Sequence, residues 1–122
     1  MTRNFRDFEA GPDPFGKKWR VELVWLQTAI SIRHSDSVDV KFFVSDGERT
    51  TEKVVALPHA TLRELSERGG RRLSDPWCMK LAALHLRHVI ETGEDMEKTL
   101  LMVMPAQLAR YAQMLEEAPV AK

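Results

Sequence analysis

The chain has 122 residues, of which 43% are hydrophobic and 30% are charged, a balance typical of globular rather than disordered proteins. This length accommodates one domain and leaves no room for two of normal size. The 18 basic and 18 acidic side chains cancel, so long-range attraction to nucleic acid or to anionic lipid is not expected.

Cysteine usage and hydropathy predict a cytoplasmic protein. Cys78 is the single cysteine, which excludes an intrachain disulfide and fits a reducing compartment. The first twenty residues contain no apolar run of signal-peptide type. No stretch approaches the roughly 18 uninterrupted apolar residues of a membrane span, so no membrane attachment is expected.

Residues 1–18 are predicted to form an extended N-terminal arm, because glycine and proline cluster there. The arm also carries Phe5, Phe8 and Phe15. Exposed aromatic surface tends to find a partner. We therefore expect the arm to dock, either on its own domain or on a neighbouring molecule.

Three strands are predicted next, over residues 19–33, 38–45 and 49–57. Apolar side chains alternate with polar ones from Trp19, as in a half-buried strand. The parity of this alternation changes past Leu26, which predicts a bulge, bend or turn near residues 26–29. Asp46-Gly47 is a strong hairpin signal, so the second and third strands should be antiparallel neighbours.

The second half of the chain predicts helices over residues 58–68, 75–92 and 105–117. Pro58 suits a first helical position, and Gly69-Gly70 and Gly93 suit helix ends. The apolar run at 99–104 fits either a buried strand or part of a continuous helix, and Pro105 favours the strand. The expected fold is a single α+β domain over 19–118. It combines an antiparallel three-stranded β-meander, with 99–104 as a candidate fourth strand, with three helices packed on one sheet face.

The helix predicted over 75–92 has a polar stripe of roughly 40° and is otherwise apolar. Such a helix either crosses the middle of the fold or meets a second subunit. The second alternative predicts a homodimer. Its interface candidates are Phe5, Phe8, Phe15, Trp77, Leu81 and Leu84.

The same helix carries the residues closest to a chemical site: Cys78, His85 and His88. Histidines three apart on a helix can share a metal or ligand. Cys78 lies about 10 Å further along the axis, too far to complete such a site unaided, and no zinc-type motif is present. The alternative is that each histidine hydrogen-bonds within the core and that Cys78 is a buried, inert thiol. No resident metal and no cofactor are expected.

Arg68, Arg71 and Arg72 flank a glycine pair between two predicted helices, as in a helix-turn-helix protein. The following helix is too apolar to present several side chains to base edges. Phosphate or nucleic-acid contact is therefore a minor alternative.

These observations do not identify an activity. The best hypothesis is a small, non-catalytic, cytoplasmic module that binds a protein or ligand and acts as a homo-oligomer. One alternative is a metal-binding protein or enzyme that uses His85 and His88. Another is a regulator that contacts nucleic acid through the Arg68–Arg72 loop.

Overall fold

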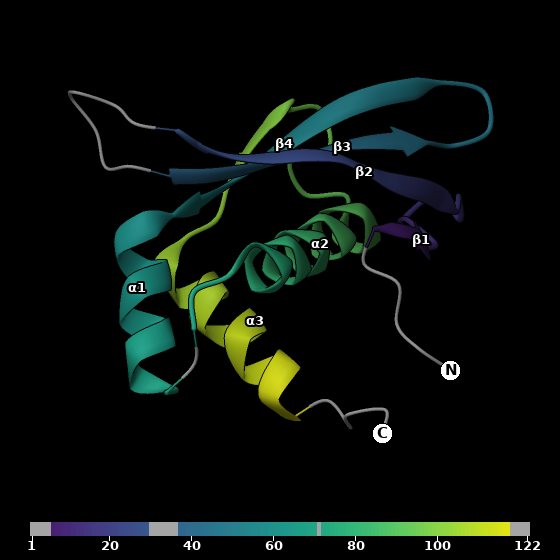
Figure 1. The fold of residues 1–122 in the computed structure, drawn as a ribbon. Coiled ribbons are helices and arrows are strands. Elements are labelled where there is room, and N and C mark those ends of the chain that lie inside the picture. The colour runs from purple at the N-terminus through teal and green to yellow at the C-terminus, as the bar shows by residue number, and fades with distance from the viewer. Residues whose placement is uncertain (1–5, 30–36, 71, 118–122) are drawn as a thin grey trace.

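A computed structural model describes residues 6–29, 37–70 and 72–117 of the chain. It confirms the α+β class, because a five-stranded mixed sheet is combined with three helices. The strands are β1 (Asp7–Ala10), β2 (Trp19–Ala29), β3 (Ser37–Ser45), β4 (Thr50–Pro58) and β5 (Leu100–Met102). The helices are α1 (His59–Arg68), α2 (Asp75–Thr92) and α3 (Pro105–Glu117). Figure 1 shows the three helices on one side of the sheet.

The strands lie in the order β1-β2-β3-β4-β5. The first four are antiparallel neighbours, whereas β5 pairs with β4 in parallel. Residues 99–104 therefore contain a strand and are not part of a continuous helix. Pro58, expected to be the first residue of a helix, is instead the last residue of β4 and the N-cap of α1, with extended backbone.

Part of the segment that the sequence assigns to an N-terminal arm belongs to the sheet. Residues 7–10 form β1, in which Phe8 lies opposite Val21 of β2. The Phe8 side chain is buried in the core, where alternation places it on the face that carries Val21. Phe5 lies outside the described residues.

The expected irregularity in β2 lies earlier than the sequence predicts. Leu23 pairs with Phe42 and Trp25 pairs with Lys41, so the register shifts at Val24. One extra residue in a strand moves the following side chains to the opposite face. Leu23 and Leu26 consequently both pack against the core, although one number is odd and the other even.

Helix α2 is surrounded by its own chain. Ser74 caps its first turn, because the hydroxyl accepts a hydrogen bond from the Trp77 amide, and Gly93 ends it with φ 73°. The helix contacts the sheet through β1 to β4 and contacts α3 on another side, as Figure 1 shows. The apolar helix thus crosses the middle of the fold, the first of the two alternatives. No described helix has the length and apolar character needed to span a bilayer.

Candidate functional site

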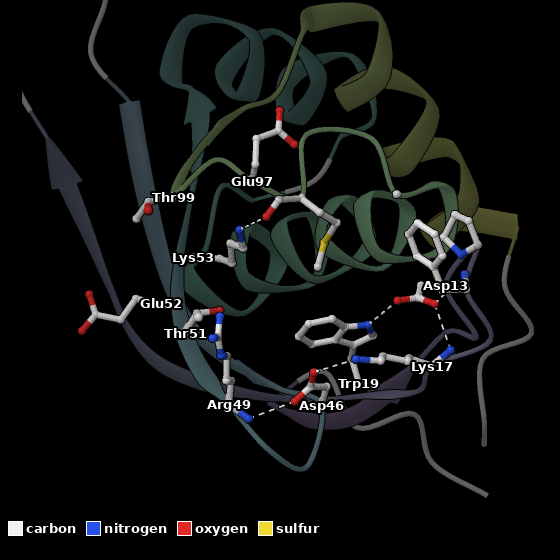
Figure 2. A pocket seen from close by; sticks show the side chains of 14 residues that line it. Asp13, Lys17, Trp19, Asp46, Arg49, Thr51, Glu52, Lys53, Glu97 and Thr99 are labelled. Atoms are coloured by element: carbon white, nitrogen blue, oxygen red, sulfur yellow. Dashed lines mark hydrogen bonds and ion pairs between the residues drawn. The ribbon is translucent and has the colours of Figure 1, made fainter.

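A cavity of about 780 Å³ lies at one end of the sheet. Three segments converge on it: the loop before β2, the β3–β4 hairpin and the loop after α2. Pockets that hold small ligands enclose about 300–1,000 Å³, so the volume suits a small organic molecule. Its lining residues include Asp13, Pro14, Phe15, Lys17, Trp19, Asp46, Arg49, Thr51, Glu52, Lys53, Met96, Glu97 and Thr99 (Figure 2).

Asp13 organises the first wall of the cavity. Its Oδ1 accepts hydrogen bonds from the backbone amides of Phe15 and Lys17, both at 2.9 Å. Its Oδ2 accepts one from the Trp19 indole Nε1 at 3.0 Å. The bond from Trp19 is the largest cause that lowers the pKa of Asp13. This carboxylate therefore shapes the loop and fixes the indole as a wall of the cavity.

Asp46 organises the hairpin in the same way. Its Oδ1 accepts hydrogen bonds from the amides of Glu48 and Arg49 at 3.0 and 2.9 Å. These backbone bonds, that of Arg49 first, lower the pKa of Asp46 to about 2. Its Oδ2 lies 3.4 Å from Lys17 Nζ. The ion pair links the hairpin to the loop before β2, and Lys17 is neutralised by it.

Lys53 is a charged residue on the core-facing side of β4. It alternates along the strand with the same period as the buried Val55 and Leu57, and the residue is 5% exposed. The ammonium group donates hydrogen bonds to the carbonyl oxygens of Met96 and Lys98. Burial lowers the pKa of Lys53, which the negative charge of Glu97 opposes. The side chain therefore clamps the loop after α2 onto the sheet and leaves one of its three N–H donors uncommitted.

Arg49 lies on the same wall as Lys53. Figure 2 shows its side chain extending beside Thr51, across the cavity from the Trp19 indole. Within the described residues the Arg49 guanidinium forms no ion pair. Glu52 pairs instead with Lys41 at 3.0 Å, and Figure 2 shows its carboxylate directed away from the cavity. Among the described residues no carboxylate forms an ion pair with Arg49 or Lys53, so the wall that carries them presents positive charge to the cavity.

The histidines predicted as ligand candidates lie elsewhere. His85 is buried, and its Nδ1 lies 2.9 Å from the Tyr111 hydroxyl oxygen. Burial, followed by the nearby charge of His88, lowers the pKa of His85 to about 4. His88 Nε2 lies 3.6 Å from a carboxylate oxygen of Glu94. In the described part of the chain, no three histidine, cysteine or carboxylate side chains gather closely enough to hold a metal ion. His85 and His88 do line a common pocket of about 300 Å³ together with Glu94, so a ligand site at this pair stays a prediction.

Cys78 is buried in the core, and burial raises the pKa of its thiol to about 12. Four of the residues predicted to form a subunit interface are also buried within the chain itself, namely Phe8, Trp77, Leu81 and Leu84. Phe15 differs from them, because it is 89% exposed at the edge of the cavity.

The arginine group is not assembled into a site by the described residues. The Arg68 guanidinium pairs with Glu64 one turn earlier in α1, at 2.5 Å. Arg72 is exposed in the connection to α2, and Arg71 lies outside the described residues. Contact with nucleic acid through this loop stays a prediction.

Sequence reasoning missed the cavity residues Asp13, Trp19, Asp46, Arg49 and Lys53 as a group. One signal was present: Lys53 occupies an inward position of a strand whose other inward residues are valine and leucine. A lysine at such a position is buried only if its ammonium group finds polar partners. The carbonyl groups that serve as partners lie more than forty positions further along the chain.

Comparison of the chain with protein-family models, with curated proteins and with solved structures found no match.

Proposed function

We propose that this protein is a small, non-catalytic module that binds a small organic molecule in the cavity between Trp19 and β4. One observation carries the proposal: the cavity is held open by the protein's own hydrogen bonds. Asp13 holds Trp19, Asp46 holds the hairpin and Lys53 holds the loop after α2. Largely pre-formed cavities with apolar walls and a few polar groups are typical of ligand sites. These charged groups are committed to fixed bonds, which favours binding over catalysis.

Cytoplasmic residence and self-association belong to the same proposal. A single thiol, buried and protonated at neutral pH, suits a reducing compartment. Apolar side chains remain exposed on the outer side of the sheet and beyond it, among them Phe43, Leu100 and Met102. Sedimentation equilibrium measures the mass of the protein in solution and so tests self-association. A monomeric mass at high protein concentration would exclude self-association.

The number of non-hydrogen atoms in a simple probe sets the affinity to expect from it. Drug-sized ligands gain about 0.3 kcal/mol per non-hydrogen atom, which serves as a conservative value for simple probes. A naphthalene ring with one substituent therefore gains about 4 kcal/mol, a dissociation constant of about 1 mM. The test consequently uses probes at millimolar concentration and a method that detects weak binding.

Protein NMR provides that method, because each of the three tryptophans has its own indole N–H signal. The probes are 2-naphthoate, 2-naphthalenemethanol and 2-naphthylmethylamine. At least one probe should shift the Trp19 indole signal saturably, together with the amide signals of the loop after α2. The Trp77 indole, which is buried in the core and does not line the cavity, should not shift.

A matched pair of variants locates the binding. Thr51 lines the cavity, and Thr50 faces the opposite side of the sheet. Thr51→Phe fills the cavity and should abolish the shifts, whereas Thr50→Phe should preserve them. The proposal is overturned if no probe perturbs Trp19 at millimolar concentration, or if Thr51→Phe binds as well as the wild type.

A further inference from the structure

Seven charged residues line the cavity, and three carboxylates and one ammonium group among them are already engaged by the protein itself. Asp13 has accepted three hydrogen bonds, and Asp46 two hydrogen bonds and an ion pair with Lys17. Glu52 pairs with Lys41 outside the cavity. Among these four groups Lys17 is the single cation, and the carboxylate of Asp46 balances its charge.

The other three charged residues of the cavity are two cations and one anion. Arg49 has no ion pair within the described residues, and Lys53 has one donor left after its bonds to Met96 and Lys98. Glu97 is the opposing charge, close enough to Lys53 to raise its pKa. Figure 2 places Arg49 and Lys53 on the β4 side of the cavity, and Glu97 at the rim away from Trp19.

The opposite wall offers an apolar surface, the indole ring of Trp19. The Trp19 indole is held in place through its N–H bond to Asp13, and Met96 also lines the cavity. A fixed aromatic ring provides a stacking surface for a flat apolar group. A methionine side chain adapts its shape to such a group and contacts it favourably.

We infer that the ligand is a small organic anion with a flat apolar body, its carboxylate bound between Arg49 and Lys53 and its body against Trp19 and Met96. The inference rests on the proposed function. A guanidinium group binds a carboxylate through two parallel hydrogen bonds, and an ammonium group adds a third. A carboxylate would also supply the partly buried ammonium of Lys53 with a counter-charge, which a neutral ligand cannot do.

The three naphthalene probes test this inference because they share one body and differ in charge. Titration at pH 7, followed through the Trp19 indole signal, should show 2-naphthoate binding at least about tenfold more tightly than the alcohol. The amine should bind most weakly. Added salt should weaken the binding of the naphthoate and leave that of the alcohol unchanged.

Substitution of Arg49, an exposed residue, tests the same point without disturbing the core. Arg49→Gln should weaken naphthoate binding by about tenfold and leave alcohol binding unchanged. Arg49→Lys keeps the charge and should restore part of the loss. Arg72→Gln, an exposed arginine away from the cavity, is the matched control and should bind all probes as the wild type does.

The outcomes separate this inference from the proposed function. Equal binding of naphthoate and alcohol, with no effect of Arg49→Gln, overturns the anion inference and leaves the cavity as a ligand site. Tightest binding of the amine also overturns it, and would assign the selectivity to Glu97. Failure of all three probes overturns the proposed function and the inference with it.

Discussion

Protonation of His85 should destabilise the fold between pH 6.5 and pH 4. Burial and the charge of His88 lower the pKa of His85 from 6.5 to about 4, while Asp95 opposes this change weakly. In this pH window the unfolded chain binds a proton that the folded chain does not. Stability therefore rises with pH across the window and is lost as the pH falls.

The magnitude follows from the two pKa values. Each unit of pH between them changes the free energy of unfolding by about 1.4 kcal/mol. The free energy of unfolding should therefore be lower by about 3 kcal/mol at pH 4 than above pH 6.5 on account of His85. A domain of this size is stable by about 5–15 kcal/mol. The physical origin is that a charged imidazole must stay in the core beside the Tyr111 hydroxyl, and there it has lost its hydration.

Urea unfolding at a series of pH values, followed by circular dichroism, measures the effect. His85→Gln removes the titrating group, so its unfolding free energy should fall less between pH 6.5 and 4 than that of the wild type, by about 3 kcal/mol. His59→Gln, at the partly exposed start of α1, should behave as the wild type. Equal pH dependence of the wild type and His85→Gln would refute the reasoning, as would a His85 imidazole that titrates near 6.5 by NMR.

Three further predictions concern stability and reactivity. Cys78 should resist a disulfide reagent such as DTNB in the native protein and react once urea unfolds it; fast native reaction would contradict its burial. Lys53→Met keeps the stem but removes both hydrogen bonds to the loop after α2, so the unfolding free energy should fall by about 2 kcal/mol. A variant as stable as the wild type would show that the clamp is dispensable. Gly93→Ala should lower the free energy of unfolding by more than the roughly 1–2 kcal/mol expected from left-handed backbone alone, because the new Cβ would lie 2.9 Å from Pro14 Cγ. Gly70→Ala has the same backbone strain and no neighbour within 4 Å, so equal losses in thermal unfolding would discount the Pro14 contact.

The local parts of the fold could be read from the sequence because their causes are local. Alternation of apolar side chains marks β2 and β3, β-branched residues mark β4, and Asp46-Gly47 marks the hairpin between the last two. The capping residues Ser74 and Gly93 delimit α2. The short strand β1 escaped notice, because four residues among glycines and prolines carry little periodicity and depend on β2 for their hydrogen bonds.

Two further features depend on contacts that the local sequence does not specify: the position of the irregularity in β2 and the surface that covers α2. When the apolar residues of a strand change from odd to even positions, the strand must contain an irregularity, but several positions for it are compatible with the sequence. In β2 the irregularity lies at Val24, which lets both Leu23 and Leu26 pack against the core. The apolar surface of α2 predicts that the helix is covered on most sides. It does not say what covers it, and here the cover is the chain's own sheet and α3. The apolar surface of α2 therefore no longer supports a second subunit, and self-association stays a prediction.

The candidate site was beyond sequence reasoning because its members are distant in the chain and common in type. Aspartates followed by glycine or proline read as turn formers, and Asp13 and Asp46 are indeed turn formers. Only their positions in space show that the two turns meet through Lys17 and enclose a cavity together with the loop after α2.

The sequence by itself determined the α+β class, the main strands and helices, and the burial of α2, because periodicity and capping act over a few residues. The tertiary structure alone decided that β1 and β5 form the two edges of the sheet, which charges are paired, and that Arg49 and Lys53 face Trp19 across a cavity. Those properties depend on contacts between residues far apart in the chain. Whether a charge is buried, paired or open to a ligand is set by its three-dimensional neighbours and not by its sequence neighbours.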